Sequence, residues 1–160
     1  MATSGYRTVS VTSYDSLRFS WERTSYSVAN NTSTISWKMQ LISTAHGAIS
    51  SSASKSWSVT VNGTKYSGTN TVGISANSTK TLANGTTTIK HNSDGTKTFS
   101  YSFSQAFNIN FNGTVGTKSG SGSGTLDSIP RKATISSAPN FNDEGSPQIT
   151  YSNPAGSSVS

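Results

Sequence analysis

Hydrophobic and polar side chains alternate along several short stretches of this chain. In the longest, residues 99–111, a large side chain occupies almost every second position. Because successive side chains of a β-strand point to opposite faces of its sheet, this spacing predicts a strand with one apolar face. Similar alternation predicts shorter strands at residues 7–11, 17–22, 35–41, 57–61, 72–74, 80–82 and 86–90. No stretch shows convincing helical spacing.

The dipeptide Asn62-Gly63 predicts a tight turn between two strands. Asn-Gly is the strongest short signal for a type I′ hairpin, because both residues tolerate a positive φ. A two-residue turn places Val59 opposite Tyr66. Tyr66 is therefore expected on the core side of the hairpin, beside Trp57.

An Asp-Gly dipeptide just before the longest strand predicts a second hairpin. A two-residue turn there would set Phe99 opposite Lys90 and mix apolar with polar faces. A three-residue loop at residues 93–95 instead pairs Ile89 with Phe99. We therefore expect this loop, with Gly95 at a positive φ.

Residues 114–126, rich in glycine and serine, form either a partner strand or a flexible linker. A two-residue turn before them would pair Tyr101 with Gly124 and Phe103 with Gly122. The aromatic rings would then cover the bare backbone opposite them. In a flexible linker the glycines would not need to keep to alternate positions, as they do here. We therefore expect a strand.

Composition agrees with a folded all-β protein. The chain has 160 residues, of which 31% are hydrophobic, together with 34 serines and 23 threonines that suit exposed strand positions. We expect an antiparallel β-sandwich of jelly-roll type over residues 1–130, since Pro130 is poorly suited to continuing a strand. Residues 131–160 are too few to bury a core. They are expected to hold a linker and the first strands of an incomplete second β domain.

The charge pattern argues against several partners. The formal net charge is +6, but the lysines are scattered singly, which favours solubilising charge over nucleic-acid binding. A weak attraction to anionic polymers is the alternative. No apolar run approaches a membrane span, the first residues show no signal-peptide pattern, and the chain has no cysteine. These features fit a virion component released by lysis.

The residues that support catalysis are few. Six carboxylates show no sign of facing one cleft, and two histidines without cysteine cannot form a zinc set. A Ser-His-Asp triad stays open at this point, because triads are defined by geometry. So does a weak calcium site using Asp94 and Asn92. We expect a non-catalytic protein without a cofactor.

Binding residues are expected where side chains leave the core pattern. Three tyrosines do so, and the outward face of the glycine-rich hairpin carries serine and asparagine side chains that could meet a glycan, a neighbouring subunit or water. The candidate ligand-binding residues are Tyr6, Tyr14, Tyr26, Ser102, Ser104, Asn108 and Ser121.

Several of these turns and strand ends resemble a known family. Residues 57–63, 91–98 and 124–131 are similar to minor structural proteins of siphophages of Gram-positive, especially streptococcal, hosts. Residues 138–144 and 148–154 resemble the Ig-like units that follow in such proteins. The resemblance implies a truncated Ig-like second domain and a tail-tip or baseplate-associated virion protein.

The resemblance also implies a function that involves no catalytic residue. Host cell-surface glycan and other tail proteins are the expected partners, and self-association into a homo-oligomer stays open. Two alternatives remain at this point. One is a purely structural spacer or oligomerisation domain of a tail fibre, and the other is a carbohydrate-binding module of a secreted bacterial protein.

Overall fold

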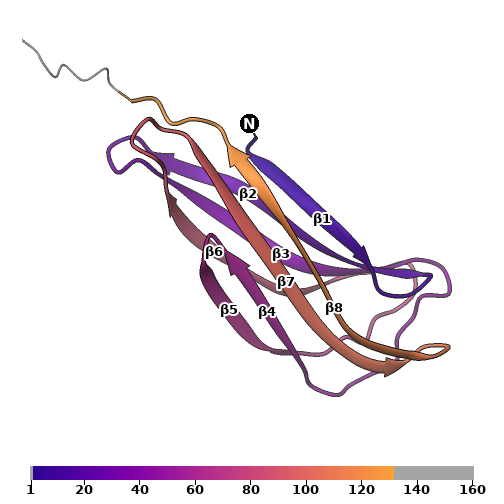
Figure 1. Cartoon of the computed structure of the whole chain (residues 1–160). Coiled ribbons are helices and arrows are strands. Elements are labelled where there is room, and N and C mark those ends of the chain that lie inside the picture. Colours follow the sequence, from indigo (N-terminus) through magenta and orange to yellow (C-terminus); the bar gives the residue numbers. More distant parts are fainter. Residues whose placement is uncertain (1, 132–160) are drawn as a thin grey trace, which may run out of the picture. The chain divides into compact units, whose positions relative to one another are not determined.

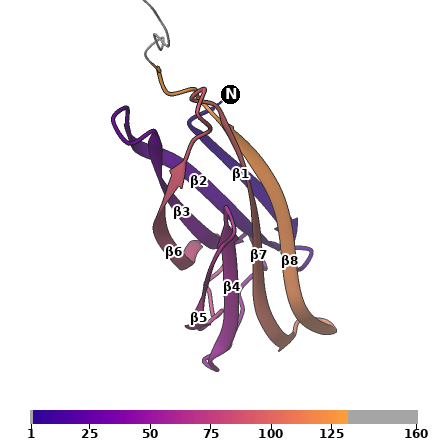
Figure 2. The ribbon, with the colours of Figure 1, turned by 60° about the vertical axis from the view of Figure 1, so that its left-hand side comes forward.

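The alternating stretches form two stacked antiparallel sheets in the structure, a computed structural model that describes residues 2–131. One sheet has the strand order β1-β2-β3-β6 and the other β5-β4-β7-β8, and they lie as two layers (Figures 1 and 2). The predicted antiparallel β-sandwich is confirmed. The strands are β1 (Ser4–Ser10), β2 (Asp15–Ser27), β3 (Thr32–Ser43), β4 (Lys55–Val61), β5 (Thr64–Asn70), β6 (Thr79–Lys90), β7 (Lys97–Asn110) and β8 (Thr114–Leu126).

Aromatic side chains from both sheets form the centre of the core. The ring of Phe19 on β2 stacks on Tyr101 and Phe103 of β7, with centroids 4.6 and 5.7 Å apart. Trp21 meets Phe99 edge to face at 5.0 Å. These contacts join the two layers, because β2 and β7 belong to different sheets.

The glycine-rich stretch is strand β8, as predicted, and its glycines serve the core. Gly124 lies opposite Phe99, Gly122 opposite Tyr101 and Gly120 opposite Phe103. A Cβ atom on Gly124 would come within 2.5 Å of the Trp21 ring, so a side chain there would collide with the core.

The predicted register of this hairpin was wrong by two residues. Its loop has three residues, 111–113, and β7 carries a bulge between Ala106 and Ile109. Asn108 sits in the bulge with a φ of 46°. Ala106 and Phe107 are consequently both buried, which a strict alternation does not allow.

The turn at Asn62-Gly63 is confirmed. Both residues have positive φ, 49° and 82°, as a type I′ turn requires, and Val59 pairs with Tyr66. The Tyr66 ring is partly buried and lies 5.2 Å from that of Trp37.

The second predicted hairpin does not form. β6 pairs with β3, while β7 pairs with β4 and β8, so the segment after Lys90 crosses from one sheet to the other. Ile89 and Phe99 are both buried, but they belong to strands of different sheets instead of lying side by side. Apolar side chains at every second position point to the core both when two strands pair in one sheet and when they lie in opposite sheets. The alternation in the sequence therefore cannot distinguish these two arrangements. Gly95 does have a positive φ, 89°.

Two shorter predictions also change. Residues 72–74 form no strand, although Ile74 makes an isolated bridge with Ile49, and residues 80–82 and 86–90 are parts of the one strand β6. No helix within residues 2–131 has the length and hydrophobicity needed to span a membrane. The predicted second domain falls on residues 132–160, which lie outside the described residues.

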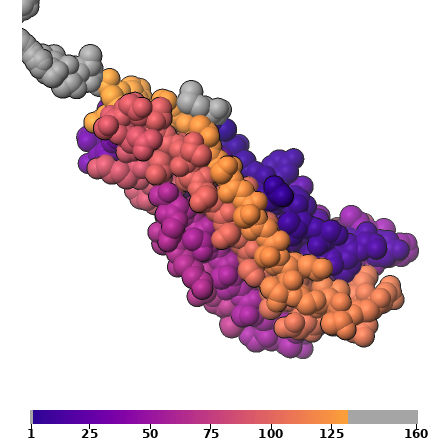
Figure 3. Space-filling view, viewed as in Figure 1, coloured from indigo at the N-terminus to yellow at the C-terminus, as the bar shows by residue number. Residues whose placement is uncertain are grey.

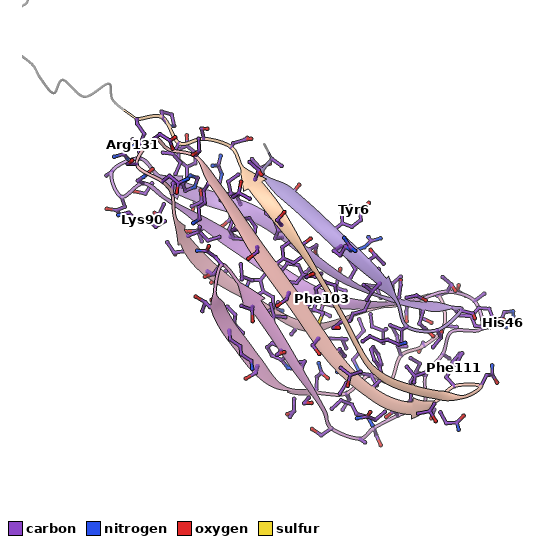
Figure 4. The ribbon with its side chains drawn as sticks, viewed as in Figure 1. Tyr6, His46, Lys90, Phe103, Phe111 and Arg131 are labelled. Carbon is purple, nitrogen blue, oxygen red and sulfur yellow. The ribbon has the colours of Figure 1, made fainter. Side chains whose placement is uncertain are left out.

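The sandwich has two distinct ends. At one end Ala2 bridges Leu126, so β1 starts where β8 finishes. At the other end lie the β1–β2 and β7–β8 loops, and Figure 4 shows Phe111 and His46 there. We call this second region the loop end.

Candidate functional site

Three tyrosines that leave the core pattern are exposed at three separate places. Their exposed fractions are 66% for Tyr6, 51% for Tyr26 and 40% for Tyr14. Each belongs to a different surface depression. A role in ligand binding remains a prediction for all three.

Tyr6 projects from β1 away from the sandwich (Figure 4). The Arg18 guanidinium lies over its ring, 4.7 Å from the centroid. The Nε of Arg18 donates a hydrogen bond to Thr8 Oγ1 at 3.0 Å. This cation–π contact and hydrogen bond restrain the tyrosine while leaving most of its surface in solvent.

The depression beside Tyr6 has a volume of about 350 Å³ and spans β1, β2 and β3. The depression forms because small outward side chains alternate with larger ones across the three strands. In one row Ser20 lies between Tyr6 and Lys38, and in the next row Glu22 lies between Ser4 and Ser36. We call these six residues and Arg18 the Tyr6 site: Ser4, Tyr6, Arg18, Ser20, Glu22, Ser36 and Lys38.

The Tyr6 site combines three kinds of group. The phenol ring offers an apolar surface, the serine hydroxyls both donate and accept hydrogen bonds, and Glu22 and Lys38 add a charged acceptor and donor. An aromatic surface beside several polar groups suits a ligand that has both an apolar face and many hydroxyls.

Tyr26 has a related arrangement near the opposite end of β2. The Arg23 guanidinium lies 4.7 Å from its ring centroid. Arg23 is tied further to the fold, because its Nη1 donates a hydrogen bond to the Asp127 carbonyl at 3.1 Å. The neighbouring depression is lined mainly by Thr3, Thr24 and Ser25.

Tyr14 lies in the loop end and makes two aromatic contacts. Its ring centroid is 5.8 Å from that of His46, in an edge arrangement, and 6.4 Å from that of Phe111. A depression of about 230 Å³ separates the loop that carries Tyr14 from the loop that carries Phe111.

Hydroxyl-bearing side chains cover most of the outward face of the β5-β4-β7-β8 sheet. Ser102 lies beside Ser121 on β8, and Ser104 lies beside Ser119, so the structure brings three of the predicted residues together. β4 and β5 extend this hydroxyl-rich surface, with Ser58 between Ser104 and Ser67. Figure 3 shows these strands as a continuous surface. We call this surface the hydroxyl face.

Asn108 is separate from the other predicted residues of that face. It is exposed, but it sits in the β7 bulge, where its carbonyl accepts a hydrogen bond from Lys55 Nζ at 3.2 Å. A shallow depression of about 410 Å³ does lie over Ser102 and Ser121. Its lining contains no charged side chain and only one ring, Tyr101, which is buried.

One serine and one histidine lie within hydrogen-bond distance of each other, as in a catalytic Ser-His pair, but both are inside the fold. Ser33 Oγ is 2.7 Å from His91 Nε2, and His91 Nδ1 is 2.8 Å from the Gly95 carbonyl. Ser33 is fully buried and His91 nearly so, which gives this pair a structural role in the crossing loop.

The Asp94 side chain is hydrogen-bonded within its own turn. Its Oδ1 accepts hydrogen bonds from the Thr96 hydroxyl at 2.6 Å and from the Thr96 N–H at 3.0 Å. These bonds lower the pKa of Asp94, with the hydroxyl making the larger contribution. Residues 2–131 contain no cluster of three or more histidine, cysteine, aspartate or glutamate side chains that could hold a metal ion.

Sequence reasoning found the tyrosines but missed their neighbours. The alternation of residues 17–22 does place Arg18, Ser20 and Glu22 outward. What it does not supply is the pairing of β1, β2 and β3, which sets Ser20 between Tyr6 and Lys38. Phe111 belongs to the alternating stretch 99–111, but β7 ends at Asn110 and Phe111 lies in the following loop. His46 lies in a loop where no periodicity applies.

Residues 9–151 match the model of a family described as siphovirus protein of unknown function (DUF859). No curated protein and no solved structure matches the chain.

Proposed function

The chain belongs to this siphovirus protein family, and on that premise we propose that it is a virion module that contacts the host surface by binding carbohydrate. The family supports a phage protein, and the proposal adds a tail or baseplate location and a glycan ligand. The observation that carries the proposal is the Tyr6 site, an exposed ring fixed beside a polar depression.

Sugars suit this site because they combine C–H faces with hydroxyl groups. Arg18 covers one face of the Tyr6 ring, and its guanidinium keeps the ring oriented before any ligand arrives. A pyranose could stack on the remaining ring surface. Its hydroxyls would then reach Ser20 and Ser36, with Lys38 as a donor and Glu22 as an acceptor.

The form of the depression sets the expected mode of binding. It extends over three neighbouring strands of a sheet, which supports binding along a polysaccharide in preference to enclosure of a small molecule. Lys38 and Arg18 outnumber Glu22, which also favours glycans with an anionic substituent over cationic ones.

We propose that the module binds its ligand without cleaving it. Hydrolysis of a glycosidic bond in the usual way needs two carboxyl groups flanking that bond. Glu22 is the one carboxylate among the residues lining the Tyr6 depression. The Ser33–His91 pair is buried and lies outside that lining.

The proposal is tested with the purified 160-residue chain on an array of host cell-wall polysaccharides and on whole host cells. We expect saturable binding to at least one polysaccharide and to cells, with no release of reducing ends. If both the array and the cells are blank, the carbohydrate claim fails. A stable homo-oligomer by light scattering would then support the alternative, a tail-fibre spacer.

A further inference from the structure

The loop end contains a second, smaller depression whose chemistry differs from that of the Tyr6 site. It lies between the β1–β2 loop and the β7–β8 loop and has a volume of about 230 Å³. None of its lining residues is charged. They are Val11, Thr12, Ser13, Tyr14, Phe111, Asn112, Gly113, Thr114 and Val115.

The position of Tyr14 is set by a dense local network. The Thr12 hydroxyl accepts hydrogen bonds from the N–H groups of Tyr14 and Asp15, each at 3.0 Å, and donates one to Asp15 Oδ2 at 2.7 Å. The Tyr14 carbonyl accepts bonds from the Thr44 N–H at 2.9 Å and the Thr44 hydroxyl at 2.8 Å. The backbone beneath this exposed ring is therefore fixed.

Asp15 anchors this loop from below. Its side chain is only 4% exposed, and its Oδ2 accepts the hydrogen bond from the Thr12 hydroxyl. The loop fixed in this way holds Tyr14, with 40% of its surface exposed, against His46 and Phe111.

The lining combines apolar and polar residues. Its apolar residues are Val11 and Val115, which are 5% and 7% exposed, and the aromatic Tyr14 and Phe111. Asn112 contributes a side-chain amide, which can donate and accept a hydrogen bond at once. Such a lining fits a small, uncharged group that joins a methyl to a planar amide.

We propose that the loop end binds the acetamido group of an N-acetylated sugar. Its methyl would contact Val11, Val115 and the two rings, and its amide would pair with Asn112. The inference rests on the proposed function, since it assumes a glycan ligand, but it assigns a separate site and a substituent.

The test uses the full chain and N-acetylglucosamine as the probe, with glucose and glucosamine as matched sugars that lack the acetyl group. Saturation-transfer NMR should show the strongest transfer at the acetyl methyl. Amide signals of residues 111–115 should shift with N-acetylglucosamine and not with the other two sugars. Equal responses to all three sugars, or none, would overturn the proposal.

Variants separate this site from the Tyr6 site. Tyr14→Ala should abolish methyl saturation, and Asn112→Ala should reduce it. Tyr6→Ala should leave the sugar-induced amide shifts of residues 111–115 unchanged, so failure of the Tyr6 claim and failure of this one give different results. If Tyr14→Ala misfolds, the wild-type amide shifts and Asn112→Ala still decide the question. Unchanged saturation in Tyr14→Ala and Asn112→Ala would place the sugar elsewhere.

Discussion

The two outward sheet faces of this sandwich are built on the same alternation but carry different chemistry. The β1-β2-β3-β6 face presents the exposed ring of Tyr6 beside Arg18, Glu22 and Lys38 around a depression. The hydroxyl face of β5-β4-β7-β8 presents mostly serine and threonine. The two faces therefore offer a ligand different groups, an exposed ring with charged side chains on one and mostly hydroxyls on the other.

The inner faces explain part of this contrast. On β8 the inward positions are given to glycines that accommodate Phe99, Tyr101 and Phe103, so the unusual composition of that strand reflects core packing. Its outward serines then need only be small and polar. On β1, by contrast, the unusual residue is Tyr6, which points outward.

The largest expected effect comes from filling the inner side of β8. Gly124→Val would drive a side chain into Trp21 and Phe99, and overpacking of this kind costs about 1–3 kcal/mol of unfolding free energy. Ser123→Val, on the outward side, is the matched control and should change stability by less than about 0.5 kcal/mol. Denaturant unfolding of both variants measures the difference. Equal losses would show that β8 is not organised around its inner face.

The next effect is on binding at the Tyr6 site. Tyr6→Ala removes the stacking surface and should weaken polysaccharide binding about tenfold, which corresponds to ~1.4 kcal/mol. Tyr26→Ala is the control, because Tyr26 is also exposed and also stacks on an arginine. Calorimetric titration with the polysaccharide identified on the array gives both affinities. A larger loss with Tyr26→Ala would move the site to the other tyrosine.

A smaller loss is expected from removing one charge at the site. Lys38→Ala deletes a donor beside Ser20 and should weaken binding roughly threefold, since one hydrogen bond contributes about 0.5–1.5 kcal/mol. Lys65→Ala removes an exposed lysine from β5 in the other sheet and serves as the control. Titration at two salt concentrations separates local pairing from general attraction. Identical losses in both variants would leave only net charge as the cause.

The smallest effect is expected from the hydroxyl face itself. The double variant Ser102→Ala with Ser121→Ala removes two neighbouring hydroxyls and should alter neither affinity nor stability by more than about 0.5 kcal/mol. The same titration and unfolding measurements apply. A clear loss of affinity would assign binding to this face and remove the contrast with the Tyr6 site.

The sequence predicted features that depend on one strand or one turn. It identified β8 as a strand, the turn at Asn62-Gly63 and the exposure of Tyr6, since each follows from parity or local backbone preference. It failed at the segment after Lys90, which joins the two sheets instead of closing a hairpin. Ile89 and Phe99 are both buried although β6 and β7 belong to different sheets, because the inward side chains of both sheets contribute to the same core.

The site was harder to predict than the fold for a related reason. Ser20 and Lys38 are far apart along the chain, and only the pairing of β2 with β3 makes them neighbours. The bulge at Asn108 likewise shifts the register without a signal in the alternation. At the loop end, the contact of Tyr14 with Phe111 joins two loops that no periodicity connects.

The most direct test of the central claim is amide chemical-shift mapping of the 160-residue chain titrated with the polysaccharide identified on the array. The account predicts that the largest shifts fall on β1, β2 and β3, at Tyr6, Ser20 and Ser36, while Ser102 and Ser121 stay unchanged. Shifts concentrated at Ser102 and Ser121, with none at Tyr6, would contradict it.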